Sequence, residues 1–287
     1  MTAGNSDDIA RACLNRLAME TAEASTDCVV FGRPLKTPIM LGGMAHYEQL
    51  HPSGAEGYAH AAREAGTAIW TGFMEDEPFE RVLAAGAPAA RILKPFRNRD
   101  LLLRAMEHDA AHGACAFCID IDHIYDKRGH CGAFAGEALQ APDRAGLEEL
   151  ARHTRLPFFV KGVLSVEDAE LCALAGVSGI VASQHQNLFP WCVPPVAQLP
   201  KLREAVGGAL TILCDSCLDD GYAAFKALAL GADAVFTVRQ MIPVFREEGP
   251  QGVRERVEKM TDELRACLSR TGSKDIRSIR PNTVELI

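Results

Sequence analysis

Eight short apolar runs recur along the chain and alternate with longer amphipathic stretches. The runs occupy residues 38–43, 67–72, 89–94, 115–120, 157–162, 178–183, 210–215 and 233–238. They lack the polar alternation of half-exposed strands, as expected for strands buried on both faces of a parallel sheet. Four intervening stretches carry apolar residues at helical spacing and end at glycines, namely 54–66, 99–113, 165–176 and 219–231. This alternation predicts an α/β fold, a closed (β/α)8 TIM barrel, with a doubly wound open sheet as the structural alternative.

Both flanks of the barrel are predicted to add helices to the same single domain. Residues 1–27 are interpreted as an N-terminal helical extension, opened by Ser6 with Asp7 and Asp8 in its first turn. Residues 28–240 form the barrel, and 241–287 hold a C-terminal helix over 251–271 and a polar tail. The 287 residues, 48% of them hydrophobic, suit one domain of this class.

The charge and the apolar runs exclude several classes of partner. The net charge of −8 argues against a broad basic face for nucleic acid. No apolar run approaches the roughly 18 residues that span a bilayer, and the first residues do not resemble a secretion signal. Ten cysteines are scattered through apolar segments, as expected of reduced thiols. We therefore expect a cytoplasmic protein that binds a small molecule and neither nucleic acid nor membrane.

Polar side chains follow almost every predicted strand. Because active sites of barrels lie at the carboxyl ends of the strands, these residues are the first candidates for function. They are Met44, His46, Tyr47, Thr71, Lys94, Asp120, Asp122, His123, Lys161, Ser183, His185, Asp215, Ser216, Cys217 and Arg239. One rim is thus predicted to gather acids, bases and cations, a mixture that a purely structural barrel does not require.

The cysteines and the remaining histidines are not expected to bind a metal ion. Two C-x-x-C pairs, 115–118 and 214–217, raise the question of zinc or a redox pair. Residues three apart on a strand point to opposite faces, so the first pair is not expected to chelate one ion. His108, His112 and His153 fall on or beside helical stretches and are interpreted as solvated.

The stretches 156–185 and 203–240, and more faintly 38–57, resemble the FMN-dependent α-hydroxy acid dehydrogenases and oxidases. The motifs VKG, SQH and FKALALGADA carry most of this resemblance. It implies a (β/α)8 barrel with FMN across the strand ends, an oxidoreductase that acts on a small organic acid, and a homo-oligomer.

The resemblance also implies roles for single residues. Lys161 in VKG matches a lysine whose ammonium faces the flavin edge where negative charge accumulates on reduction. His185 in SQH matches the histidine that takes the substrate proton. Asp122 in DIDH matches the aspartate that holds this histidine. Asp120 competes for that role, since residues two apart on a strand face the same way.

Other positions depart from the family pattern, chiefly where substrate would bind. Leu188 stands at the position of an arginine that clamps the substrate carboxylate, and Lys94 replaces a tyrosine. Arg128 lies close to a second carboxylate-binding arginine of the family. We predict Lys94 as a catalytic residue, and Arg128, His46 and Tyr47 as substrate-binding residues. Beside Lys161, the predicted cofactor-binding residues are Met44, Thr71, Ser183, Asp215, Gly221 and Arg239.

The phosphate-binding loop departs most. The family reads Asp-Gly-Gly-x-Arg-Arg-Gly, whereas residues 215–221 read DSCLDDG. Glycine lets backbone N–H groups approach a phosphate, and arginine clamps it. Asp219 at an arginine position would place like charges within a few ångströms, at a cost of about 1–4 kcal/mol. Gly221, Arg239 and the following helix are retained.

Two functions are therefore predicted from the sequence. In the first, the chain is an FMN-dependent oxidoreductase with His185 as base. In the second, a diverged barrel has lost FMN and acts as a small-molecule-binding or a structural or regulatory protein.

Overall fold

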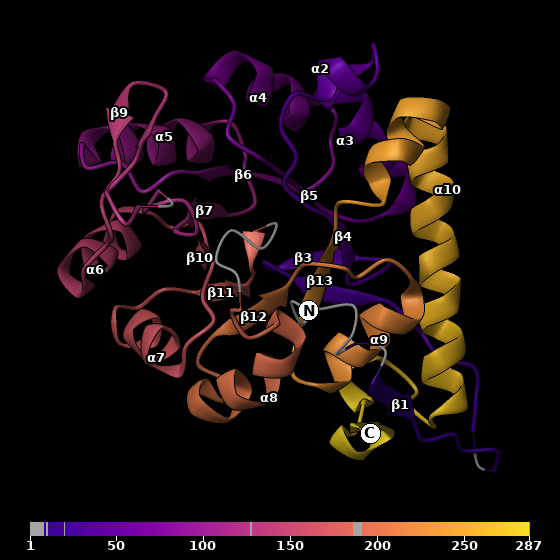
Figure 1. Cartoon of the computed structure of the whole chain (residues 1–287). Coiled ribbons are helices and arrows are strands. Elements are labelled where there is room, and N and C mark those ends of the chain that lie inside the picture. Colours follow the sequence, from indigo (N-terminus) through magenta and orange to yellow (C-terminus); the bar gives the residue numbers. More distant parts are fainter. Residues whose placement is uncertain (1–8, 10, 20, 127, 186–190, 287) are drawn as a thin grey trace.

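The computed structural model describes residues 9, 11–19, 21–126, 128–185 and 191–286. Eight parallel strands form a closed barrel (Figure 1). In chain order they are β4 (Ile39–Leu41), β5 (Ile69–Thr71), β6 (Ala89–Leu93), β7 (Phe117–Asp120), β10 (Phe158–Lys161), β11 (Gly179–Ala182), β12 (Thr211–Cys214) and β13 (Ala234–Thr237). Each predicted run contains one strand, and the pairing of β13 with β4 closes the barrel and excludes the open sheet.

Helices surround the barrel and bury the outward faces of its strands. They are α2 (Tyr47–Leu50), α3 (Gly54–Ala65), α4 (Asp76–Ala84), α5 (Arg99–Ala111), α6 (Arg144–His153), α7 (Val166–Leu174), α8 (Pro195–Val206), α9 (Gly221–Ala229) and α10 (Met241–Arg270). The four helices predicted from apolar spacing are α3, α5, α7 and α9. The long α10 packs along α3 and α9 on one side of the barrel (Figure 1).

The interior of the barrel is filled by side chains rather than left as a channel. Trp70, Phe159 and Phe236 pack against one another, with ring centroids 5.2 Å apart for Trp70–Phe159 and 5.0 Å for Trp70–Phe236. A hairpin of β2 (Cys28–Val30) and β3 (Arg33–Leu35) adds Phe31, which contacts both Trp70 and Phe159. The amino ends of the strands are therefore closed, and the carboxyl ends are where a barrel presents its active site.

The N-terminal flank differs from the prediction. Ile9 and Arg11 are helical, but β1 (Ala12–Leu14) follows at once and pairs antiparallel with β14 (Val284–Leu286). The predicted helix over 1–27 is therefore wrong after Arg11, and its predicted start at Ser6, Asp7 and Asp8 lies outside the described residues. Local periodicity could not reveal this strand, because its partner lies at the other end of the chain.

The C-terminal flank is also more structured than predicted. The helix begins at Met241 rather than at 251. It kinks at Gly249, which has a φ of 65° and comes directly before Pro250. The tail contains η2 (Ile276–Ser278), η3 (Pro281–Thr283) and β14. A second hairpin, β8 (Ala133–Phe134) and β9 (Glu137–Ala138), lies in the loop between β7 and α6.

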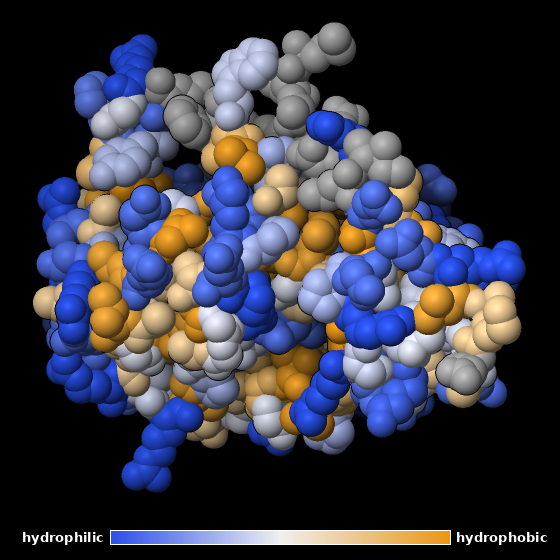
Figure 2. All heavy atoms as spheres, turned by 90° about the horizontal axis from the view of Figure 1, so that it is seen from below, coloured by the Kyte–Doolittle hydropathy of each residue, from blue (hydrophilic) through white to orange (hydrophobic). Residues whose placement is uncertain are grey.

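The surface mixes hydrophobic and hydrophilic residues, and the cysteines are free. On the face shown in Figure 2, hydrophobic residues lie among hydrophilic ones. Among the described residues, no helix is both long and apolar enough to cross a membrane. All ten cysteines lie in the described part and are free thiols, as predicted. Burial raises the pKa of the Cys115 thiol to about 12, so this thiol stays protonated near neutral pH.

Candidate functional site

Strand alternation divides the predicted rim residues into inward-facing and outward-facing ones. Cys118, Phe159 and Val181 belong to the packed interior of the barrel. The residues two positions further along, Asp120, Lys161 and Ser183, therefore face the interior as well. The same argument places Lys94 after Ile92 and Asp215 after Leu213. Five polar side chains thus converge at the carboxyl ends of five strands.

Lys161 is the centre of this arrangement. Its ammonium donates a hydrogen bond to Ser183 Oγ at 2.6 Å and lies 3.4 Å from both Asp122 Oδ2 and Asp215 Oδ2. Ser183 Oγ in turn donates to Asp215 Oδ2 at 2.9 Å. The lysine is only 7% exposed. Burial would lower its pKa, but Asp215, Asp120 and Asp122 outweigh burial and raise it, so Lys161 is a fixed cation.

A second group is built on Asp120, at the end of β7. Lys94 Nζ donates a hydrogen bond to Asp120 Oδ2 at 2.7 Å. His185 Nδ1 lies 3.3 Å from the same oxygen, within ion-pair distance but without the geometry of a hydrogen bond. The ring of His123 packs edge-on against His185, with centroids 4.1 Å apart. We call Lys94, Asp120, Asp122, Lys161, Ser183, His185 and Asp215 the lysine cluster.

Of the two aspartates of DIDH, the competing candidate Asp120 lies against the histidine. Asp120, not Asp122, contacts His185, and Asp122 contacts Lys161. The assignment of Asp122 as the residue that holds the histidine is therefore corrected. Asp120 is the last residue of β7 and faces the interior, whereas Asp122 lies beyond the strand, where the chain has turned.

The electrostatics of the two aspartates also differ. Burial would raise the pKa of Asp120, but Lys161, His185 and Lys94 outweigh it and hold the pKa well below its usual value. Burial raises the pKa of Asp122 to about 6, because Lys161 offsets only part of the effect and Asp120 and Asp215 add to it. Burial, together with Lys94 and His185, lowers the pKa of His123 to about 4. Near neutral pH, Asp120 is a carboxylate and His123 is uncharged.

The part of the rim at the start of α9, which follows β12 and Asp215 in the chain, is satisfied by the chain's own carboxylates. Asp220 caps the helix by accepting a hydrogen bond from the Ala223 N–H at 2.7 Å. The Gly221 N–H donates to Glu263 Oε2 of α10 at 2.9 Å. We call Asp219, Asp220 and Glu263 the carboxylate cap. It occupies amides that a phosphate would otherwise bind.

Gly221 has a packing role that explains why it is glycine. A Cβ at this position would lie 2.1 Å from Met260 O and 2.5 Å from Leu264 N, both in the backbone of α10. Its amide and its missing side chain both serve the contact between α9 and α10, and its role in cofactor binding stays a prediction. Arg239 is exposed. Burial raises the pKa of Asp219, and the positive charge of Arg239, which would lower this pKa, offsets only part of the effect.

The two parts of FMN, its ring and its phosphate, therefore meet different surroundings at the lysine cluster and at the carboxylate cap. The lysine cluster offers two buried cations and a serine hydroxyl facing the barrel axis, a donor set that suits the electron-rich edge of a flavin ring. The carboxylate cap does not suit a phosphate dianion, which would meet like charges and amides already bound. The lysine cluster therefore suits the ring of FMN, whereas the carboxylate cap weakens the contact with its phosphate.

Several other predicted residues lie away from the interior. Thr71 follows the inward-facing Trp70 and therefore faces the helices, where its buried Oγ1 has no partner among the described residues. Tyr47 is 1% exposed and packs on Tyr58 and Phe245, with centroids 5.3 Å and 6.4 Å away. Their predicted cofactor and substrate contacts are thus corrected, because both side chains belong to the outer layer.

The other predicted positions are placed as follows. Met44 is buried, and its carbonyl accepts a hydrogen bond from the Gly72 N–H at 2.7 Å. His46 is exposed, with a φ of 58°. Arg128 is exposed in the turn after Asp126, whose Oδ1 accepts its backbone N–H at 2.8 Å. Leu188 lies outside the described residues.

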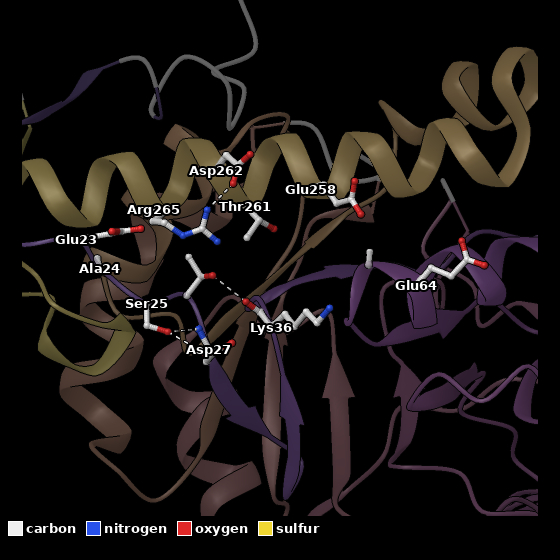
Figure 3. Close-up of a pocket in the computed structure, with 12 residues that line it drawn as sticks. Glu23, Ala24, Ser25, Asp27, Lys36, Glu64, Glu258, Thr261, Asp262 and Arg265 are labelled. Atoms are coloured by element: carbon white, nitrogen blue, oxygen red, sulfur yellow. Dashed lines mark hydrogen bonds and ion pairs between the residues drawn. The ribbon is translucent and has the colours of Figure 1, made fainter.

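A separate cavity lies at the closed end of the barrel. It has a volume of about 610 Å³ and is lined by the segment leading into β2, by Lys36 and by α10 residues such as Arg265 (Figure 3). Glu64 and Ala65 also line it, and they end α3 just before the amino end of β5. This cavity is therefore remote from the lysine cluster.

Comparisons with known proteins identify close relatives of this arrangement. The sequence matches the family described as FMN-dependent dehydrogenase over residues 2–131 and 126–286. It is 29% identical to L-lactate oxidase of Alicycliphilus denitrificans, over 95% of the chain and 84% of the relative. It is 27% identical to 4-hydroxymandelate oxidase of Amycolatopsis orientalis, over 92% and 84%. A mandelate oxidase variant with a monooxide FMN adduct superposes with a TM-score of 0.90 at 26% identity, covering 99% of the chain and 91% of that structure.

Proposed function

The chain belongs to the FMN-dependent dehydrogenase family, and from this premise we propose that it is an oxidoreductase of a small organic acid, with FMN as cofactor and His185 as base. The observation that carries the proposal is the lysine cluster, in which Lys161, Asp120 and His185 meet at the carboxyl ends of the strands. The relatives named lactate and hydroxymandelate oxidase support a hydroxy acid as substrate class.

His185 is oriented for proton transfer by its neighbour. With Nδ1 against the Asp120 carboxylate, the N–H of the neutral ring belongs on Nδ1, and Nε2 is left with a lone pair. His185 Nε2 can then take a proton from the substrate, and the low pKa of Asp120 keeps a negative charge beside the cation that forms. His123 stays uncharged at neutral pH and so does not oppose this cation.

The two lysines serve different parts of the proposed reaction. FMN, when bound, supplies the two-electron oxidation that the side chains themselves cannot perform. Lys161 provides a fixed positive charge facing the barrel axis. Lys94 uses one ammonium hydrogen for Asp120 and has two more donors, which can bind the substrate carboxylate. Arg128, on the exposed loop after β7, would add a second anion contact when substrate is bound.

The carboxylate cap favours a second candidate function. Since Glu263 and Asp220 already bind the amides at the start of α9, a barrel that has given up FMN and binds another small molecule is consistent with this end of the rim.

We further propose that the protein is cytoplasmic and forms a homo-oligomer. The free thiols and the family resemblance support these points, and light scattering of the purified protein tests the second.

Absorbance of the purified protein separates the two functions. A yellow protein with flavin bands that releases FMN on denaturation is the expected result. A colourless protein that also fails to take up added FMN would reject the oxidoreductase and favour the second function.

A substitution then tests the role of His185. His185→Gln should abolish turnover of hydroxy acids while flavin stays bound, because the amide cannot act as a base. Loss of flavin in this variant would show that the histidine serves cofactor binding instead.

A further inference from the structure

A compact group of potential metal ligands lies on the outside of the barrel, between α4 and α5. Glu80 of α4 faces two histidines that lie one turn apart at the end of α5. They are His108, in the last turn of the helix, and His112, the C-cap residue of the helix. Glu80 Oε1 lies 2.9 Å from His108 Nε2 and 3.8 Å from His112 Nε2. The two imidazole rings stack with centroids 4.2 Å apart. We call these three residues the His–Glu cluster.

The hydrogen bonds of the histidines leave the same nitrogen of each ring facing Glu80. His112 Nδ1 lies 2.8 Å from the backbone oxygen of His108, an acceptor, so this nitrogen carries the proton. His108 Nδ1 lies 3.3 Å from Asp109 Oδ1, which is likewise an acceptor when ionised. A metal ion would take the place of the proton that His108 Nε2 shares with Glu80 Oε1 at 2.9 Å, while the contacts of both Nδ1 atoms remain. Such outer contacts commonly orient histidine ligands of zinc.

The support behind the cluster is rigid. Asp109 is fully buried, and Arg91 holds it through Nε at 3.1 Å and Nη2 at 2.9 Å. Carboxylate oxygens of Glu80, Asp109 and Asp76 lie 2.9 Å, 3.3 Å and 3.9 Å from the ring nitrogens of His108. The negative charge around His108 therefore suits a bound cation at this position.

The dimensions suit a small transition-metal ion. Nitrogen and oxygen ligands bind zinc at roughly 2.0–2.1 Å, so two ligand atoms of a tetrahedral site lie about 3.3 Å apart. The distances of 2.9 Å and 3.8 Å lie on either side of this value, and all three ligand atoms lie within 4.8 Å of one another. His112 and Glu80 are each 44% exposed at the side chain, so an ion can enter and keep a water as fourth ligand.

We propose that Glu80, His108 and His112 form a binding site for Zn²⁺ or a similar divalent transition-metal ion, which joins α4 to α5. This differs from the interpretation of these histidines as solvated. Among the described residues a second set, Asp120, His123 and His185, is also close enough to share an ion. There, however, Lys94 Nζ lies 2.7 Å from Asp120 Oδ2 and opposes a second cation.

Calorimetric titration of the chelator-treated full chain with zinc chloride at pH 7.5 tests the proposal. We expect one equivalent of Zn²⁺ to bind at the His–Glu cluster, with a rise in the melting temperature. His112→Ala and Glu80→Ala should each weaken zinc binding at least tenfold, because each removes one of three ligands. His112 is half exposed, so its loss should leave the fold intact.

Two control variants make the result specific. His153→Ala removes a comparable histidine, whose Nε2 lies 3.2 Å from Glu107 Oε1 but which belongs to no group of three ligands among the described residues. It should bind zinc like the unchanged protein. His123→Ala should also bind zinc normally. Absence of zinc binding by the unchanged chain, equal binding by His112→Ala, or loss of binding in His123→Ala rather than His112→Ala would overturn the proposal.

Discussion

The lysine cluster and the carboxylate cap lie on the same rim of the barrel, but they satisfy their polar groups in different ways. In the lysine cluster, side chains from adjacent strand ends meet, and two cations are buried among three carboxylates. In the carboxylate cap, α10 reaches across the start of α9 and supplies Glu263 to a backbone amide. The first arrangement keeps buried charges directed at the barrel axis, whereas the second uses up donors that could bind an anion.

This difference follows from how the two groups of residues are placed. Residues of the lysine cluster are placed by strands whose register is fixed by the closed sheet, so they are held in position whatever ligand is present. The start of α9 depends on helix packing, and there Gly221 admits the backbone of α10. Changes in a few loop residues at the start of α9 can therefore alter this end of the rim without disturbing the barrel.

The largest expected effect comes from removing the central cation. Lys161→Met should lower the free energy of unfolding by about 3–5 kcal/mol, because Asp215 and Asp122 would be left buried without their partner. Denaturant unfolding measures this loss. Lys201→Ala, at an exposed position of α8, is the control and should change stability by less than about 0.5 kcal/mol. Equal effects of the two variants would show that the lysine cluster is not held by charge.

The second test uses the raised pKa of Asp122. Because this carboxyl binds a proton more tightly in the folded state, its contribution to stability is greatest below pH 4 and is lost as pH rises through about 6. The rise from 3.8 to about 6 corresponds to at most about 3 kcal/mol. The free energy of unfolding of the unchanged protein should therefore include a fall from pH 4 to pH 7 that is due to Asp122. Asp122→Asn should remove this part of the pH dependence. An unchanged pH profile would contradict the assignment.

A smaller effect is expected at the contact between α9 and α10. Gly221→Ala should destabilise the protein by about 1–3 kcal/mol, since the new methyl group would overlap the α10 backbone. Gly208→Ala is a matched control, because a Cβ there meets nothing within 4 Å. Thermal unfolding of both variants measures the difference. If Gly221→Ala were as stable as Gly208→Ala, the packing role of Gly221 would be wrong.

The smallest effect concerns charge in the carboxylate cap. Asp219→Arg should strengthen FMN binding about tenfold, or about 1.4 kcal/mol, by replacing a like charge with an opposite one. Riboflavin, which lacks the phosphate, should bind this variant no better than the unchanged chain. Fluorescence titration measures both affinities. Equal gains for FMN and riboflavin would mean that the substitution acts on the ring and not on the phosphate.

Much of the fold could be predicted because its signal is local. Each barrel strand is a continuous apolar run, and the residue after each run reaches the rim by the geometry of the fold. Strand alternation places Lys161 and Ser183 inward and Thr71 outside. Tyr47 differs from the prediction for a related reason, because a polar residue after a strand can turn into the helical layer.

The remaining features depend on partners far away in the sequence. Glu263 lies on α10, and nothing in its local sequence shows that its carboxylate reaches Gly221. The pairing of β1 with β14 likewise joins opposite ends of the chain. The choice between Asp120 and Asp122 required the turn after β7, which spacing alone does not determine.

The most direct test of the contrast between the two ends is the affinity of the unchanged protein for FMN and for riboflavin under the same conditions. If the lysine cluster binds the ring and the carboxylate cap rejects the phosphate, both should bind, with dissociation constants within about tenfold of each other. FMN binding more than about a hundredfold tighter than riboflavin would show that the phosphate is well bound despite the cap. Failure of both to bind would show that the lysine cluster does not hold a flavin ring.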